Sequence, residues 1–333
     1  MENFKYLKKI ISTSKNILIT THDYPDADGI GSQLALAEAL KGLKKNVHCV
    51  NEEALIERFS FLHTHKSIIS FEKFAKKKRV KVDYVIIVDT HNYLRCGKKI
   101  VDYLQKLDAP IFYIDHHPCR EEVQKHHLID NTAAATGELV AKIISKLKIE
   151  FTRSMAIALY TAIVIDTSSF RYPTVTGETH RIIAKLLETG ITPHQVYNQL
   201  YAKKGIAHMH LLGKVLQSAN VNRRNDFAWI TFNSKDLKEF DSEVEDTHSF
   251  INNLLVLDGI KVACSFRIDK ETIKISFRSI GVYDVGMLAT YLGGGGHSHS
   301  AATVIPLQKK APYRLIDEMI RTIDFFIKNY KLG

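Results

Sequence analysis

Short apolar runs alternate with amphipathic stretches through the first half of the chain. In stretches such as 32–43 and 138–147, apolar residues recur at intervals of three and four, which predicts helices. The short runs are typical of buried strands, and strands separated by helices favour βαβ units with a parallel sheet. The predicted strands are 17–21, 47–50, 84–89 and 111–114.

The run at 155–165 is too long for a strand, so we interpret it as a buried helix. Three more helices are predicted after it, at 179–187, 193–201 and 206–218. The pattern changes near residue 220, and strands are predicted at 228–232, 261–268 and 272–279, the last two forming a hairpin. Helices are predicted at 248–257, 284–292 and 313–330.

This change of pattern predicts two domains in an α/β protein. The length of 333 residues supports this division, because a single domain typically has ~100–200 residues. We expect a first domain with a parallel sheet and flanking helices over 1–190 and a helical connector over 191–219. A smaller α/β domain is expected over 220–333, with the active site in the cleft between the two domains.

Composition narrows the class of protein. With 45% hydrophobic and 25% charged residues the chain is close to globular averages, which excludes a disordered or collagen-like protein. The 46 basic residues exceed the 36 acidic ones and leave a net charge of +10. This excess indicates an anionic partner, but it does not distinguish a nucleic acid from a nucleotide or a membrane surface.

The cysteines and the apolar runs indicate a soluble cytoplasmic protein. The 4 cysteines are far apart and form no C-x-x-C pair, so neither a zinc knuckle nor a disulfide framework is expected. Lysines interrupt the N-terminal stretch before an apolar segment of signal-peptide length can form. No apolar run reaches the ~20 residues that a membrane-spanning helix needs.

Acidic residues and histidines follow apolar segments at four places along the chain. Carboxyl ends of parallel strands line the ligand crevice of an open sheet, so these residues can converge there. They are His22, Asp26 and Asp28 after the first strand, Asp89 after the third, Asp115, His116 and His117 after the fourth, and Asp166 after the buried helix.

Such a cluster of carboxylates needs cations to neutralise it, because the acids would otherwise repel one another. Mixed imidazole and carboxylate ligands suit Mn, Fe, Co or Zn, and two metals ~3.5–4 Å apart commonly hydrolyse phosphate esters. The residues therefore predict a dinuclear phosphoesterase, although any single strand-end Asp is more often a cap or a turn residue. His91, two residues past Asp89, either reaches the edge of this site or caps the following helix.

A run of four glycines, Gly293 to Gly296, precedes His297 in the second predicted domain. Glycine is unfavourable inside helices and strands, but it lets backbone N–H groups approach an anion closely. Arg278, beside Ser279 in the predicted hairpin, offers a guanidinium fork for a phosphate. Alone the glycine run would fit a flexible turn, whereas beside the basic hairpin and a metal centre we interpret it as a phosphate-binding loop.

These motifs together resemble those of the DHH phosphoesterase superfamily. The stretch from His22 to Ser32, with Pro25 and Gly31 in it, is followed in order by Asp89, the Asp-His-His triplet and Asp166. The SFRS and GGGGH segments resemble the DHHA1 substrate-binding domain. The length resembles that of the stand-alone nano-RNase type, which degrades very short RNAs and often dephosphorylates 3′-phosphoadenosine 5′-phosphate (pAp).

The resemblance implies roles for these residues. Two divalent metal ions, usually Mn²⁺, would share Asp89 as a bridging ligand, while His117 contacts the scissile phosphate and Asp115 orients the histidine pair. One metal would be held by His22, Asp26 and Asp89, and the other by Asp28, Asp89, His116 and Asp166. The terminal phosphate or nucleotide would be held by Arg278, Ser279, Gly293, Gly294, Gly295, Gly296 and His297. Ala302 departs from the family pattern, in which glycine is usual at this position.

The expected activity is metal-dependent hydrolysis of RNAs of 2–5 nucleotides to mononucleotides, together with conversion of pAp to AMP and phosphate. The alternative is a phosphodiesterase of cyclic dinucleotides or of their linear products, pApA and pGpG. A pyrophosphatase would lack the GGGGH loop, and a catalytically silent regulator would have lost a ligand. Expected partners are short single-stranded RNA and nucleotides, not a membrane. The oligomeric state stays open, with a homodimer as one option.

Overall fold

The computed structural model describes residues 2–55, 59–62, 67–77, 80–242, 247, 249–308 and 311–330. The chain divides into two compact units, Met1–Lys203 and Lys204–Gly333. The boundary lies inside the stretch predicted as a connector, and the two helices of that stretch pack into different cores. Val196 and Leu200 join the core of the first unit, whereas Leu211 and Val215 join a core of the second.

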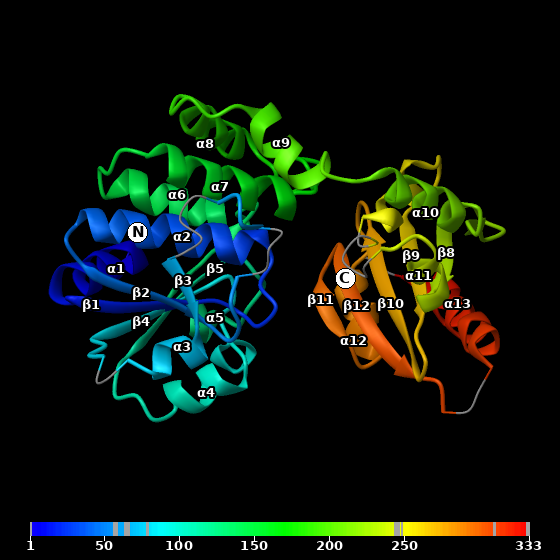
Figure 1. Ribbon diagram of the computed structural model, residues 1–333, viewed down its shortest axis with the longest axis horizontal. Helices are drawn as coiled ribbons and strands as arrows, with labels where there is room; N and C mark the ends of the chain where they lie inside the picture. The colour runs from blue at the N-terminus through cyan, green and yellow to red at the C-terminus, as the bar shows by residue number, and fades with distance from the viewer. Residues whose placement is uncertain are drawn as a thin grey trace. The chain divides into compact units, whose positions relative to one another are not determined.

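A parallel sheet of 6 strands forms the centre of the first unit (Figure 1). Its strands are β1 (Asn16–Thr20), β2 (Asn46–Asn51), β3 (Ile68–Ser70), β4 (Tyr84–Val88), β5 (Ile111–Asp115) and β6 (Leu128–Ile129). They pair in the order β3-β2-β1-β4-β5-β6. Every residue of β4 is buried, because both faces of the sheet are covered and successive side chains point to opposite faces.

Helices cover both faces of this sheet (Figure 1). One face carries α1 (Glu2–Thr13), α2 (Ala27–Gly42), α6 (Thr136–Lys146) and α7 (Arg153–Asp166), with α8 (Gly177–Leu187) and α9 (Pro193–Tyr201) packed against α7. The other face carries α3 (Phe71–Ala75) and α4 (Lys98–Leu104). Two short helices lie in loops, η3 (Tyr93–Arg95) and α5 (Glu121–Gln124).

Helices α2 and α7 pack closely, and a glycine permits the approach. A Cβ atom added to Gly31 would overlap the carbonyl oxygen of Ala158 and would also meet the Cβ of Ala162. The residues of α7 from Met155 to Val164 are all buried, which agrees with the buried helix predicted from the sequence. Because α7 ends at Asp166, this packing brings its last residue beside the N-terminal part of α2.

The second unit has a mixed sheet of 6 strands with helices on both faces (Figure 1). Its strands are β7 (Asn220–Val221), β8 (Phe227–Asn233), β9 (Val262–Ile268), β10 (Thr272–Ser279), β11 (Gly295–His297) and β12 (Ser300–Pro306), in the order β11-β12-β10-β9-β8-β7. Only the β8–β9 pair is parallel among the described residues. The helices are α10 (Ile206–Leu216), α11 (Ser234–Glu239), η5 (Phe250–Val256), α12 (Val285–Tyr291) and α13 (Pro312–Asn329).

Most of the predicted elements are confirmed, and the differences have local causes. The stretch predicted as an α-helix from residue 248 is a 3₁₀ helix over Phe250–Val256, and residue 248 lies outside the described residues. Strand β11 was missed because the glycine run was interpreted as a phosphate-binding loop, and β12, which follows it directly, was not predicted. The edge strands β3, β6 and β7, each of 2 or 3 residues, are too short to show a periodic pattern.

Candidate metal centre

The loop between β1 and α2 carries three of the predicted ligands. Asp26 is the N-cap of α2, and its Oδ1 accepts hydrogen bonds from the backbone N–H groups of Asp28 (2.9 Å) and Gly29 (3.2 Å). The Nδ1 of His22 lies 2.9 Å from the backbone oxygen of Asp23, so Nε2 is the ring nitrogen that faces Asp89. Capping and metal binding are compatible here, because capping occupies a single oxygen of Asp26.

Asp28 is completely buried, and its carboxylate binds the N-terminus of α6. Its two oxygens accept hydrogen bonds from the backbone N–H groups of Thr136 and Gly137, each at 2.7 Å. The N-cap residue of α6, Ala135, makes no side-chain capping bond, so Asp28 supplies the acceptor that this helix end needs. Burial raises the pKa of the Asp28 carboxyl, although His116 and these N–H groups act against it.

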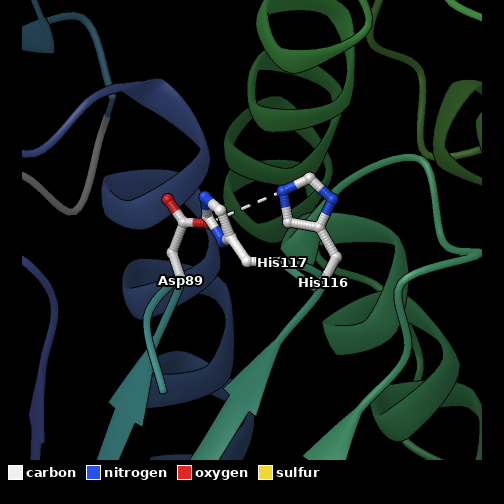
Figure 2. A group of neighbouring side chains, drawn as sticks. All are labelled: Asp89, His116 and His117. Atoms are coloured by element: carbon white, nitrogen blue, oxygen red, sulfur yellow. Dashed lines mark ion pairs between the residues drawn. The ribbon is translucent and has the colours of Figure 1, made fainter. Parts of the chain in front are cut away.

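Asp89 lies between the other predicted ligands. It follows β4 with a left-handed φ of 62°, and the hydroxyl of Thr136 donates to its Oδ1 at 3.0 Å. Its Oδ2 lies 3.4 Å from Nε2 of His22, and its Oδ1 lies 3.9 Å from ring nitrogens of both His116 and His117. Figure 2 shows the Asp89 carboxylate with the two imidazole rings that follow β5.

Asp115 holds two histidines at once. Its Oδ1 is 2.6 Å from Nδ1 of His117, and its Oδ2 is 2.6 Å from Nδ1 of His91. The backbone N–H groups of His116 and His117 also donate to Oδ1, at 2.8 and 3.2 Å. Burial by itself would raise the pKa of this carboxyl, but the bonds from His117 and His91 outweigh burial and lower it. Asp115 therefore remains ionised and orients both rings.

His116 faces a group of carboxylates. Its Nδ1 lies 3.4 Å from the backbone oxygen of Ala133, and its Nε2 lies 3.2 Å from Asp166 and 3.8 Å from Asp28. Burial raises the pKa of Asp166 to about 8, assisted by the charges of Asp28 and other acids. Burial acts in the opposite direction on His116, but Asp166, Asp28 and Asp89 outweigh it and raise the pKa of the ring to about 9.

The donor atoms fall into three groups, each with its atoms within 4.8 Å of one another. They are His22 with Asp26 and Asp89, Asp28 with His116 and Asp166, and Asp89 with His116 and His117. The first two groups match the residues assigned to separate metals by the family resemblance, and Asp89 adjoins both. Burial, followed by the charges of neighbouring acids, raises the pKa values of Asp28, Asp89 and Asp166, and a divalent cation offsets both effects. The imidazole and carboxylate donors therefore fit Mn²⁺ or a similar metal.

The structure places Arg278 and Ser279 at the end of β10. The Nη1 of Arg278 donates to the backbone oxygen of Phe277 at 2.8 Å. Ser279 is buried, and its hydroxyl donates to the backbone oxygen of Tyr283 at 2.6 Å and lies 3.0 Å from Nδ1 of His299. The Ser279 hydroxyl is thus used within the unit, where it ties the end of β10 to the segment before β12.

The glycine run has structural roles that were not predicted from the sequence. Gly293 has φ +81° and ends α12, because its N–H bonds to the oxygen of Thr290 and that of Gly294 to the oxygen of Ala289. Gly295 and Gly296 belong to strand β11, so the expectation that these glycines avoid a strand was wrong. A Cβ on Gly294 would overlap the carbonyl oxygen of Ala302, and one on Gly296 would overlap Ala301.

The departure at Ala302 has no backbone cost in this structure. Ala302 lies in β12, where it pairs with Gly295 on one side and Ser276 on the other, and it is not among the residues with positive φ. His297 is the last residue of β11 and pairs with Ser300. The pairing of Gly295 with Ala302 and of His297 with Ser300 therefore makes the end of the glycine run a strand of the sheet.

Comparison with protein families agrees with the two-unit architecture. The N-terminal domain model of the DHH family matches residues 16–163, and the DHHA1 domain model matches residues 231–329. The chain is a DHH–DHHA1 protein. The candidate metal centre lies in its DHH domain, and Arg278 and the glycine run lie in its DHHA1 domain.

Relatives of this DHH–DHHA1 protein carry names of nucleotide hydrolases. The bifunctional oligoribonuclease and PAP phosphatase NrnA of Thermus thermophilus is 28% identical over 308 residues, covering 92% of this chain and 89% of the relative. The cyclic-di-AMP phosphodiesterase GdpP of Geobacillus thermodenitrificans is 27% identical over 314 residues, covering 89% of this chain and 45% of the relative.

A solved structure confirms the fold of the DHH–DHHA1 chain. The crystal structure of an exopolyphosphatase-related protein from Bacteroides fragilis superposes with a TM-score of 0.89 at 24% identity, covering 98% of both chains. Among the described residues of the present protein, no helix combines the length and the apolar character needed to cross a membrane.

Two residues of the DHH domain join the site without having been assigned to it from the sequence. Thr136 donates its N–H to Asp28 and its hydroxyl to Asp89, so it holds two of the predicted ligands. Its only sequence signal is a Thr-Gly pair before an apolar helix, which is also typical of an ordinary helix start. His91 reaches the edge of the site through Asp115, which decides between the two roles left open for it.

Proposed function

We propose that this protein is a metal-dependent phosphoesterase that hydrolyses RNAs of 2–5 nucleotides to mononucleotides and converts pAp to AMP and phosphate. The observation that carries the proposal is the position of Asp89, which adjoins both His22 with Asp26 and His116 with the buried acids. One carboxylate between two donor groups suits a pair of metal ions acting on one phosphate. The similarity to the NrnA protein supports the choice of substrates.

The proposed ligands divide between two divalent ions. Such ions supply Lewis-acid polarisation of phosphoryl oxygens and a nucleophile from water at neutral pH. We assign one ion to His22, Asp26 and Asp89, and the other to Asp28, Asp89, His116 and Asp166. Thr136 keeps Asp28 and Asp89 in place through its backbone and hydroxyl donors.

His117 is proposed to donate a hydrogen bond to the phosphoryl group under attack. Its Nδ1 is held by Asp115 at 2.6 Å, and we assign Nε2 as the ring nitrogen that contacts the substrate. The ionised Asp115 favours a proton on Nδ1, and in the imidazolium form of the ring Nε2 also carries a proton that can be donated. His117 can therefore stabilise negative charge that develops on a phosphoryl oxygen during hydrolysis.

The DHHA1 domain is proposed to bind the far end of the substrate. Arg278 offers its guanidinium to a terminal phosphate, and the backbone of Gly293 to Gly296, with His297, offers further donors. Ser279 already donates to Tyr283, so we assign it the task of positioning this loop. Contacts with phosphate alone, without base-specific contacts, are consistent with short substrates of varied sequence.

A panel of substrates with Mn²⁺ tests the proposal. We expect turnover of pAp and of di- to pentanucleotides, and at least about tenfold slower turnover of a 24-mer, because phosphate contacts at both ends select for length. Asp89→Asn should remove the activity, and it controls for contaminating nucleases. Absence of turnover on every nucleotide of the panel would overturn the proposal.

Cyclic di-AMP belongs in the same panel because it tests the alternative function. The similarity to GdpP, at 27% identity over 89% of this chain, favours that alternative as the second candidate. Hydrolysis of cyclic di-AMP at a higher kcat/KM than any linear dinucleotide would select it over the oligoribonuclease.

A further inference from the structure

The turn that follows α7 has an unusual backbone. Ser168, Ser169 and Phe170 are consecutive, and their φ angles of 49°, 61° and 64° all lie in the left-handed region. Residues with a Cβ atom rarely adopt this conformation, and then usually singly. Such strain persists where the surrounding structure imposes it, and it is concentrated at functional sites. The turn begins two residues after Asp166.

Helix termination explains only the first of these three residues. The N–H of Ser168 bonds to the oxygen of Ile165, and the N–H of Ser169 bonds to the oxygen of Val164, which is the usual pattern for a helix that ends with a left-handed residue. A conventional helix end would then return to the extended region. Here Phe170 stays left-handed, and its N–H bonds to the hydroxyl of Thr167 at 3.0 Å.

The consequence of the extended turn is the position of Arg171. Its N–H bonds to the oxygen of Thr167 at 2.9 Å, so the chain returns over the end of α7. Its guanidinium donates from Nε to the backbone oxygen of Ser168 (2.8 Å) and from Nη2 to the Ser168 hydroxyl (2.6 Å). The Cα of Ser168 lies within ~7 Å of that of Asp166, because two residues separate them by no more than this. The guanidinium of Arg171 is therefore fixed on the turn that directly follows Asp166, one of the proposed metal ligands.

The hydrogen-bond partners of Arg171 are neutral oxygens of Ser168, whereas some other cations of the DHH domain are paired with acids. Lys142 pairs with Glu138, and Arg181 pairs with Glu178 at 3.1 Å. Across the described residues, the ion pairs found do not include Arg171. Its side chain is exposed, and a guanidinium has five N–H donors, of which two are used by Ser168. The remaining donors and the full charge are available to an anion.

We propose that Arg171 is a substrate-binding residue of the DHH domain, where its guanidinium donates to a non-bridging oxygen of the phosphate at the metal centre. The ligand class is a nucleotide phosphomonoester or phosphodiester. This inference rests on the proposed function and adds a residue to it. Ser168 acts as a positioning residue, because its carbonyl and hydroxyl hold the guanidinium in one orientation.

The test compares Arg171→Gln and Arg171→Lys with the control Arg181→Gln, which removes the same charge from an exposed site on α8. Kinetics on pAp and a dinucleotide with Mn²⁺ give kcat and KM, and equilibrium binding of pAp in EDTA gives affinity without turnover. We expect Arg171→Gln to raise KM and to weaken pAp binding about tenfold or more, the range for a hydrogen bond to a charged group. Arg171→Lys should recover part of the affinity, because it keeps the charge but loses the fork.

A second variant separates substrate binding from turn stability. Ser168→Ala keeps the guanidinium but removes the hydroxyl that orients it, and we expect KM to rise about fivefold with an unchanged melting temperature. An Arg171→Gln protein that melts like the wild type and matches Arg181→Gln in KM and in pAp affinity would overturn the inference alone. A wild-type enzyme inactive on every nucleotide would overturn the proposed function, and with it this assignment.

Discussion

At the scale of single residues, Asp89 connects the two groups of proposed metal ligands. Its two oxygens face different partners, with His22 on one side and His116, His117 and Thr136 on the other. Burial and neighbouring acids, Asp28 first among them, raise the pKa of this carboxyl well above its ordinary value. An ionised carboxylate in this position destabilises the fold unless a cation is bound. A substitution of Asp89 should therefore affect activity and stability in ways that can be measured separately.

Asp89→Asn should lose more activity than the 10–100-fold typical of changes to residues that only support metal ligands. The amide keeps the shape of the side chain but provides one neutral oxygen, so the protein should remain folded and bind less metal. Turnover of pAp and the metal content after dialysis measure these effects. Asp102→Asn, an exposed acid on α4, is the control. Equal metal content and turnover in the two variants would contradict the prediction.

His91 should matter although it belongs to none of the three donor groups. It shares Asp115 with His117, so His91→Gln removes one of two histidine donors from that carboxylate. We expect about a tenfold loss of kcat/KM, at the lower end of the range for groups that orient a functional residue. The exposed His126 provides the matched control, His126→Gln, which should leave kcat/KM unchanged. Identical kinetics for both variants would show that His91 has no such role.

At the scale of elements, the glycine run shows how packing and function can use the same residues. Gly293 ends α12, while Gly294 and Gly296 allow the chain before and within β11 to approach β12. The sequence indicated an anion-binding loop, which remains a proposal. The close contact between backbones is an independent reason for glycine, and it operates with or without a ligand.

Gly294→Ala should destabilise the protein by about 1–3 kcal/mol, the range for overpacking a close contact. The added Cβ would overlap the carbonyl oxygen of Ala302 and the Cβ of Thr303, both in β12. Gly213→Ala is the control, because that glycine lies in α10 with no atom within 4 Å of the added Cβ, and alanine favours the helix there. Urea unfolding measures both variants. Equal stability would mean that β11 shifts freely.

The whole molecule couples its stability to pH and to metal through the buried acids. The pKa of Asp166 rises from 3.8 to about 8, so its contribution to stability is complete below pH 3.8 and is lost as the pH rises through 8. The pKa of His116 rises from 6.5 to about 9, so its contribution is also lost as the pH increases, between 6.5 and 9. Both groups therefore make the metal-free protein less stable at alkaline pH.

Metal-free protein in EDTA should melt at a lower temperature at pH 8.5 than at pH 6. The expected decrease is at least ~2–4 °C, the shift that 1 kcal/mol produces in a domain of about 200 residues. Mn²⁺ should oppose the decrease, because metal binding displaces protons and so strengthens as pH rises. A saturating excess of 100 times Kd would add about 2.7 kcal/mol. Scanning calorimetry with Mn²⁺ and EDTA at both pH values measures the effect, and Asp89→Asn should lose the response to Mn²⁺. A melting temperature that does not change with metal at either pH would contradict this prediction.

Residue order alone predicted the parallel sheet, the buried helix α7 and the positions of the acids after apolar segments. These features are local, because strand and helix periods can be read over 5 to 15 neighbouring residues. The convergence of His22, Asp89 and His116 followed from one rule, that parallel strands end at the same edge of a sheet.

Which atoms come into contact depends on the packing of elements that are far apart in the chain. Thr136 reaches Asp28 across 108 residues of sequence, and His91 reaches Asp115 across 24, through hydrogen bonds that no periodic pattern records. Gly294 is required because β12 lies too close for a side chain at that position. The position of Arg171 follows from three consecutive left-handed residues, none of which is a glycine. Periodicity reports which face of an element is buried, whereas the close contacts of a site depend on how separate elements pack.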